Sequence, residues 1–135
     1  MKTTVVGVDV QSVAEVETAL ATFGPRYVRR LFCKEEEDYA ETHPNTAARF
    51  LAERFAAREA ILKLLEADDA MGHWRDLKIS SANTSTPAVA LVRDSMIRAR
   101  LRGISTIHLC VDSAGDVAIA VAVADLCVEA GEETT

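Results

Sequence analysis

The sequence predicts a single α+β domain, in which helices from the first half of the chain pack against a mainly antiparallel sheet. The surest helix is residues 49–65, which are rich in Ala, Leu, Glu and Arg and contain neither Gly nor Pro. Strands are indicated by β-branched residues near the N-terminus and by the alternating run Val117–Val123. The 135 residues, 49% of them apolar, can enclose one modest core. We therefore expect one domain over residues 1–128 and a polar tail over residues 129–135.

The first half is predicted to form one strand followed by helices. Thr3–Val10 reads as a buried strand, because its β-branched residues surround one glycine. Ser12 is a suitable N-cap for the next helix, and Glu15 would complete a capping box. The expected helices are Val13–Phe23, which stops at Gly24-Pro25, then Arg26–Leu31, and a third that begins after Cys33 and runs toward Glu41. His43-Pro44-Asn45-Thr46 then supplies a cap for the central helix.

The central helix has an apolar half that should face the core. On a helical wheel this half contains Phe50, Leu51, Phe55, Ala57, Ile61, Leu62, Leu64 and Leu65. Arg54 and Arg58 lie near the middle of the apolar arc, so each needs an anion or a carboxylate nearby. Glu59 and Lys63 lie on the opposite arc above small alanines, where they form either an ordinary ion pair or part of a site.

The second half is predicted to be mainly β. Residues 66–75 read as a loop in which Trp74 folds back onto the core, and His73 could be a ligand, a base or neither. The expected elements are short strands Leu77–Ser80 and Ala88–Val92, a helix Asp94–Leu101 closed by Gly103, and a hairpin of Ile104–Val111 and Asp116–Ala124 around the turn Asp112–Gly115. These strands and the N-terminal strand should supply the sheet.

Composition excludes several classes of protein. A net charge of −6 argues against general nucleic-acid binding, which relies on a basic face. No apolar run is long enough for a membrane span, and no secretory leader is recognisable, so we expect a cytoplasmic protein. Cys33, Cys110 and Cys127 show no CxxC spacing, so we expect neither a disulfide framework nor a zinc site.

A local basic cluster stands out from this acidic background. Arg26, Arg29 and Arg30 lie close together just before the acidic run 35–38. Such a cluster is either a solvated helix face or a surface that steers an acidic partner by complementary charge.

A motif in the central helix resembles that of a known enzyme family. Phe50-Leu-Ala-Glu-Arg-Phe-Ala-Ala-Arg-Glu-Ala60, followed by Lys63, closely resembles the F-L-A-x-R-F-A-A-K-E-A-x-x-K signature of the small trimeric holo-acyl-carrier-protein synthases, a class of 4′-phosphopantetheinyl transferases. Val6-Gly-Val-Asp9 looks like that family's G-x-D strand end, and residues 23–36 resemble its F-x-x-R-F-x-x-R-I-F-T-x-x-E segment. The order and spacing of these motifs match over nearly the whole chain.

The resemblance implies a magnesium-dependent transfer of the 4′-phosphopantetheine group from coenzyme A to a serine of an apo acyl carrier protein. It assigns Asp9 and Glu59 to the metal, and Lys63 to the phosphate or to activation of the serine. Hard divalent ions are commonly held by two carboxylates, with water and phosphate completing the octahedron. In the resembled family the sheet lies at the centre of a trimer, and the active site spans two subunits.

The resemblance also implies contacts with both substrates. The coenzyme A contacts would be Arg54, Arg58, Lys63 and Pro87, and the carrier-protein contacts would be Arg26, Arg29 and Arg30.

This chain departs from the family pattern at several positions. Glu15 stands where the family has an arginine, Leu64-Leu-Glu-Ala-Asp68 replaces Ala-Leu-Gly-Thr-Gly, Ser85-Thr-Pro87 replaces Gly-Lys-Pro, and Cys110-Val-Asp-Ser113 replaces Ser-x-Ser-His. Two hypotheses are therefore open: a divergent transferase, or a non-catalytic relative that binds a carrier protein or partner complex through the same surface. We favour the transferase, because binding alone would not demand Asp9, Glu59 and Lys63 together.

Overall fold

The structure, a computed structural model, describes residues 2–67, 74, 76–80 and 84–127. Its elements are, in chain order, β1 (Lys2–Ser12), α1 (Val13–Phe23), α2 (Pro25–Leu31), α3 (Lys34–Thr42), α4 (Ala47–Leu65), β2 (Leu77–Ile79), β3 (Val89–Leu91), α6 (Arg93–Arg102), β4 (His108–Ala114) and β5 (Val117–Cys127). The predicted α+β class is confirmed.

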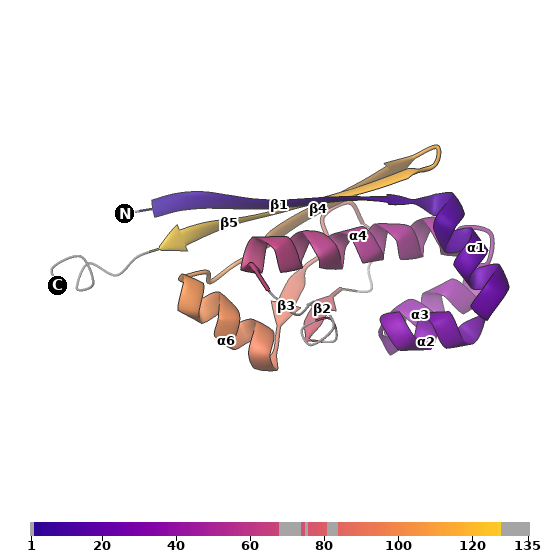
Figure 1. Ribbon diagram of the computed structural model, residues 1–135, viewed down its shortest axis with the longest axis horizontal. Helices are drawn as coiled ribbons and strands as arrows, with labels where there is room; N and C mark the ends of the chain where they lie inside the picture. Colours follow the sequence, from indigo (N-terminus) through magenta and orange to yellow (C-terminus); the bar gives the residue numbers. More distant parts are fainter. Residues whose placement is uncertain (1, 68–73, 75, 81–83, 128–135) are drawn as a thin grey trace, which may run out of the picture.

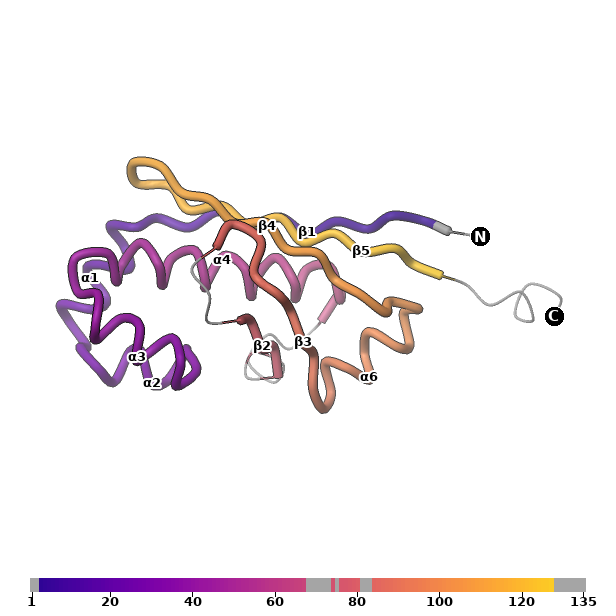
Figure 2. The backbone as a smooth tube through the Cα atoms, turned by 180° about the vertical axis from the view of Figure 1, so that it is seen from behind, coloured from indigo at the N-terminus to yellow at the C-terminus, as the bar shows by residue number. Residues whose placement is uncertain are grey.

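The long strands form one antiparallel sheet in the order β1-β5-β4, and α4 packs along one face of it (Figure 1). Helices α1, α2 and α3 gather at one end of α4, whereas β2, β3 and α6 lie toward its other end, as the view from behind also shows (Figure 2). Strands β2 and β3 pair with each other in a separate two-stranded sheet. The helix α4 therefore connects both ends of the molecule.

Small residues let α4 approach the sheet closely. Every second residue of β5 from Ala118 to Ala124 is an alanine with at most 1% of its surface exposed. On β1, a Cβ added at Gly7 would lie 2.0 Å from the carbonyl oxygen of Ala60. Real Cβ atoms do not approach a carbonyl oxygen so closely, so only glycine fits at this point of β1. The backbones of β1 and α4 are in direct contact there.

The helices of the first half follow the predicted pattern. The bounds of α1 agree with the prediction, and Ser12 accepts a hydrogen bond from the backbone N–H of Glu15, as expected of an N-cap. Asp116 adds a further acceptor at this helix start, because its Oδ1 accepts from the backbone N–H of Ala14 at 2.7 Å. Trp74 is 3% exposed and its indole N–H donates to the carbonyl oxygen of Leu31, which confirms that it folds onto the core.

The strand predictions need three corrections. The N-terminal strand is not buried on both faces, because Val6, Val8 and Val10 are exposed on the side away from α4. The strand β4 begins at His108 rather than Ile104, which forms only an isolated bridge to Leu126. The hairpin turn is also tighter than predicted: Ala114 pairs with Val117, so the two residues between them, including Gly115 at φ 58°, make the turn.

Several predicted features lie outside the described residues, namely His73, most of the loop 66–75 and the tail 129–135. Cys33, Cys110 and Cys127 are free thiols. None of the helices in the described part of the chain is long and apolar enough to span a membrane.

Candidate active site

The close contact of β1 with α4 brings Asp9 and Lys63 together. Lys63 Nζ lies 3.0 Å from Asp9 Oδ1 and donates to the carbonyl oxygen of Val8 at 2.9 Å. The Asp9 side chain is 12% exposed, whereas that of Lys63 is 53% exposed. The ammonium thus reaches a largely buried carboxylate from the solvent side.

Glu59 belongs to the same cluster. Burial raises the pKa of the Glu59 carboxyl, the negative charge of Asp9 raises it further, and Lys63 lowers it. Glu59 also precedes Lys63 by one turn of α4, so the two side chains lie on the same face of that helix. The structure therefore brings together Asp9, Glu59 and Lys63, although their chemical roles remain predictions.

This arrangement fits a hard divalent cation. Two carboxylates on neighbouring elements, one of them with a raised pKa, favour a positive charge nearby. Carboxylate oxygens are the ligands that Mg²⁺ prefers, and it commonly takes one or two of them with water and substrate phosphate oxygens. No group of three or more His, Cys, Asp or Glu side chains suited to a metal occurs among the described residues. Asp9 and Glu59 would supply two such oxygens, and water and substrate oxygens would complete the octahedron.

Arg54 and Arg58 are buried against a carboxylate of the same chain. Arg58 donates to Glu36 Oε2 at 2.7 Å, and Arg54 Nη1 lies 4.0 Å from the same oxygen. Glu36 has no exposed surface, and its other oxygen accepts from the backbone N–H of Cys33 at the start of α3. Burial lowers the pKa of the Arg54 guanidinium, while Glu36 opposes that shift. The wheel pattern predicted the need for an anion or a carboxylate, and Glu36 supplies the carboxylate.

A surface cavity lies beside Arg58. It measures about 420 Å³, and its lining includes Arg58, Lys34, Lys78, Trp74 and Phe32. Cationic and aromatic side chains together suit an anionic ligand with an apolar body. Arg58, a predicted coenzyme A contact, is thus in the wall of this cavity, with its side chain 2% exposed and bonded to Glu36.

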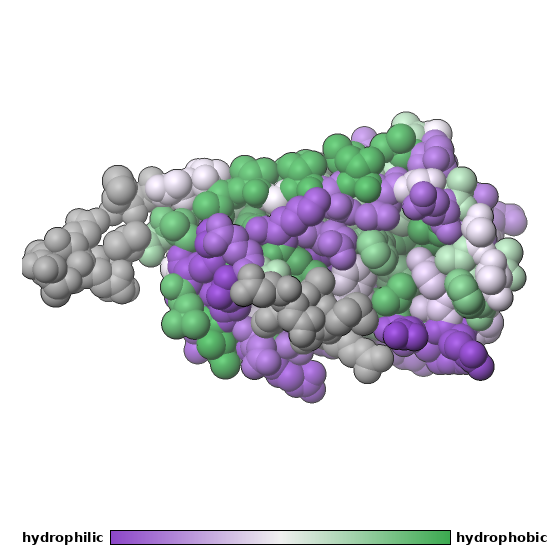
Figure 3. Space-filling view, in the orientation of Figure 1, coloured by the Kyte–Doolittle hydropathy of each residue, from purple (hydrophilic) through white to green (hydrophobic). Residues whose placement is uncertain are grey.

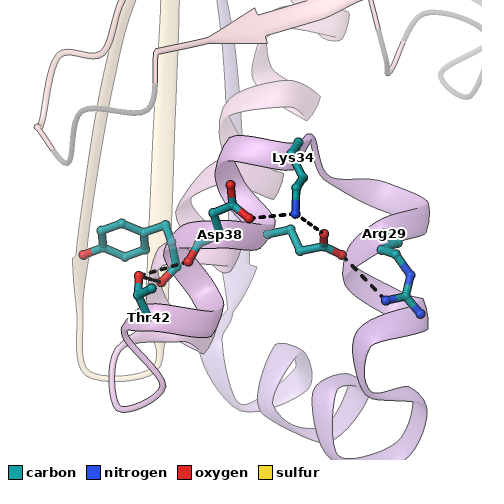
Figure 4. A network of polar contacts seen from close by, with 6 residues as sticks. Arg29, Lys34, Asp38 and Thr42 are labelled. Carbon is teal, nitrogen blue, oxygen red and sulfur yellow. Dashed lines mark hydrogen bonds and ion pairs between the residues drawn. The ribbon is translucent and has the colours of Figure 1, made fainter.

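The basic cluster of Arg26, Arg29 and Arg30 lies on α2. Arg26, Arg29 and Arg30 are all exposed, and Arg29 also approaches Glu37 of α3, with 3.9 Å between Arg29 Nη1 and Glu37 Oε2. Figure 4 shows this contact within a network that continues through Lys34, which lies 2.9 Å from Asp38. All three arginines are thus available to a partner, and Arg29 also contacts α3.

The end of β4 contains a contact that the sequence did not suggest. Ser113, at the position of the family's histidine, donates to Glu53 Oε2 of α4 at 2.5 Å.

The sequence analysis did not identify Glu36, Glu53 or Gln11 as candidate residues. Gln11 could have been found, because it lies two residues after Asp9 on a predicted strand and therefore on the same face. Glu36 follows Cys33 at capping-box spacing, which was a second available signal. Pro87, a predicted coenzyme A contact, is buried just before β3.

Comparisons with known proteins agree with this fold. A family model described as the 4′-phosphopantetheinyl transferase superfamily matches residues 5–122. The chain is 34% identical over 119 residues to a holo-[acyl-carrier-protein] synthase of Desulforudis audaxviator, covering 88% of this chain and 90% of that protein. It is also 34% identical over 119 residues to a holo-[acyl-carrier-protein] synthase of Anaeromyxobacter dehalogenans, covering 84% and 89%.

Solved structures show the same fold. A complex of the synthase of Chronobacterium ammoniagenes with coenzyme A has a TM-score of 0.78 at 19% identity, covering 93% of this chain and 99% of that chain. The acyl carrier protein synthase of Mycobacterium tuberculosis has a TM-score of 0.64 at 28% identity, covering 91% and 97%. With the family match extending over most of its length, this chain belongs to the 4′-phosphopantetheinyl transferase superfamily.

Proposed function

We propose that this chain transfers the 4′-phosphopantetheine group of coenzyme A to a serine of an apo acyl carrier protein. Membership of the superfamily supports this activity, as do relatives named holo-[acyl-carrier-protein] synthase and a similar structure that is a coenzyme A complex. The observation that carries the proposal is the convergence of Asp9, Glu59 and Lys63 where β1 crosses α4.

The reaction replaces a phosphoanhydride bond of the coenzyme A diphosphate by a phosphate ester bond to serine. The serine oxygen forms a bond to phosphorus, the bond to the departing 3′,5′-ADP breaks, and the serine proton is released. Negative charge therefore builds on the phosphate oxygens and on the leaving group. A bound Mg²⁺ would neutralise part of that charge and act as a Lewis acid on the phosphoryl oxygens.

The residues of this chain have distinct roles in the proposal. Asp9 and Glu59 hold the cation from two different elements, so the position of the cation depends on the contact of β1 with α4. Lys63 acts as a positive point charge for the phosphate, because its flexible side chain is half exposed and already lies at the edge of the carboxylate pair.

We assign further residues to the two substrates. Arg54, Arg58, Lys63 and Pro87 are the proposed coenzyme A contacts, and the cavity beside Arg58 supports this for Arg58. Arg26, Arg29 and Arg30 are the proposed contacts for an acidic carrier protein. The exposure of Arg26 and Arg30 supports that role.

We also propose that the chain assembles as a trimer through the outer face of its sheet. Val6, Val10 and Val117 are between 49% and 55% exposed, and Val8 and Ile119 are 44% and 37% exposed. Figure 3 shows hydrophobic surface along the edge that the sheet occupies. A contiguous apolar patch of this kind usually marks an interaction site. Assembly through it would allow active sites to lie between subunits.

Mass spectrometry of an apo carrier protein tests the activity. Incubation with the protein, coenzyme A and Mg²⁺ should add the mass of one phosphopantetheine arm to the carrier. Glu59→Gln should lower the rate by about 100-fold or more, because losing a metal ligand removes several kcal/mol of transition-state stabilisation. Glu41→Gln, an exposed glutamate on α3 that does not line the cavity beside Arg58, is the matched control and should react normally.

The same assay separates the transferase from the alternative in which the chain only binds. If several apo carriers bind tightly yet gain no mass in the presence of coenzyme A and Mg²⁺, the chain is a non-catalytic relative that uses the same surface.

A further inference from the structure

Gln11 makes the shortest polar contact to the carboxylate of Asp9. Its Nε2 lies 2.6 Å from Asp9 Oδ2, while Lys63 Nζ contacts the other oxygen, Oδ1, at 3.0 Å. Both oxygens of Asp9 are thus engaged by donors from different elements. Gln11 is two residues beyond Asp9 on β1, so the two side chains leave the strand on the same face.

We propose that Gln11 is a positioning residue of the cation site. Its carboxamide holds Oδ2 and thereby fixes the rotation of the Asp9 carboxylate, so that Oδ1 points to the space shared with Glu59 and Lys63. The inference rests on the proposed function, because it assumes that Asp9 binds the cation.

The position of Gln11 fits this role better than a merely structural one. Its side chain is half-buried rather than part of the core, so it contributes little to packing. A terminal carboxylate torsion is soft and roughly two-fold, so a carboxylate that is held only by its own packing rotates readily. Hydrogen bonds from neighbouring side chains orient ligating carboxylates, and their loss typically weakens metal affinity by about 10–100-fold.

The contact at the other oxygen of Asp9, Oδ1, indicates why the orientation of this carboxylate matters. Lys63 Nζ lies at Oδ1, and Glu59 is one turn before Lys63 on the same face of α4. Oδ1 is therefore the oxygen of Asp9 that faces the side of α4 where Glu59 lies. A carboxamide donor on Oδ2 is neutral, so it holds Asp9 without reducing the negative charge available to the cation.

Isothermal titration calorimetry with coenzyme A tests this role. Dissociation constants are measured in Mn²⁺ and in EDTA, and their ratio gives the contribution of the metal. For Gln11→Met, which keeps the length of the side chain but removes the donor, that ratio should fall by about 10-fold. The dissociation constant in EDTA should stay unchanged, which a general loss of structure would not allow.

Thr4→Val is the matched control. Thr4 also donates from β1 to an aspartate, with 3.2 Å between its Oγ1 and Asp125 Oδ1, but it lies on an exposed part of the strand. Its metal-dependent ratio should equal that of the unsubstituted protein. An unchanged ratio in Gln11→Met, or an equal loss in Thr4→Val, overturns the assignment of Gln11. If the unsubstituted protein shows no metal dependence at all, the metal in the proposed function fails instead, and the role of Gln11 falls with it.

Discussion

Gly7 of β1 lies against the backbone of Ala60 in α4, with only 2.0 Å between an added Cβ and the Ala60 carbonyl oxygen. Asp9 follows Gly7 by two residues, and Glu59 directly precedes Ala60. The close contact of these two backbones is thus what places the two acids at one site. A wider separation of β1 from α4 would pull the carboxylates apart.

Replacing Gly7 with alanine should destabilise the protein and impair the site. The added methyl group forces β1 away from α4, and overpacking of this kind costs about 1–3 kcal/mol. Urea denaturation measures the free energy of unfolding. Gly115→Ala is the control, because nothing lies within 4 Å of its Cβ position and only its positive φ of 58° is strained, at a cost of about 1 kcal/mol. Equal stability of Gly7→Ala and the unsubstituted protein would show that the contact is looser than described.

Replacing Glu36 with glutamine should lower the free energy of unfolding by far more than its position on a short helix suggests. The substitution leaves the buried Arg58 without its carboxylate at 2.7 Å, and breaking a buried ion pair from one side costs about 3–5 kcal/mol. Chemical denaturation should show this loss. Glu35→Gln, the exposed neighbour, should change the free energy of unfolding by less than about 0.5 kcal/mol. Similar values for the two variants would count against a structural role of Glu36.

The pH dependence of stability should report on Glu59. Burial raises the pKa of Glu59 in the folded state, so the folded protein binds this proton more tightly than the unfolded chain does. The contribution of protonated Glu59 to the stability of the fold is fully present at pH values below its ordinary pKa of 4.5. It is lost as the pH rises through the raised pKa of the folded state.

Denaturation of the metal-free protein and of Glu59→Gln over this pH range tests that sign. The stability of the unsubstituted protein relative to the variant should fall as pH rises above 4.5, and Mg²⁺ should restore it near neutral pH. If the stability of the unsubstituted protein relative to Glu59→Gln instead rises with pH in the absence of metal, the folded protein does not disfavour the charged form of Glu59.

A charge on the outer face of the sheet should prevent assembly. Val8 is 44% exposed in the single chain, and burying a lysine at this position in a subunit interface is unfavourable. Light scattering after size-exclusion chromatography should give a trimer for the unsubstituted protein and a monomer for Val8→Lys. Leu101→Lys changes an even more exposed apolar residue, on α6, and should leave the trimer intact. Trimeric Val8→Lys would exclude this face as the interface.

Local signals in the sequence were sufficient for much of the fold. The bounds of α1 could be predicted because its N-cap, Ser12, and its stop signal, Gly24-Pro25, directly flank the helix in the sequence. The start of β4 could not be predicted in the same way. Residues near Ile104 are β-branched, yet Ile104 makes only a bridge to Leu126 because the chain there is still leaving α6. The start of β4 therefore depends on tertiary structure rather than on the local sequence.

The partners of charged residues were the least predictable part of the site. The helical wheel showed that Arg54 and Arg58 needed an anion, but Glu36 is 22 residues from Arg58 in sequence. Lys63 was expected either to pair with Glu59 or to join a site, and its closest carboxylate is Asp9, 54 residues away. Spacing along one helix identifies which side chains share a face, but not which distant element covers that face.

Diffraction from crystals grown with coenzyme A and Mn²⁺ tests the shared cation most directly. Anomalous scattering locates manganese independently of any assumption about its ligands. The proposed function predicts one manganese peak in direct contact with a carboxylate oxygen of Asp9, a carboxylate oxygen of Glu59 and an oxygen of the coenzyme A diphosphate. Bound coenzyme A with no such peak, or with manganese away from these two acids, would contradict it.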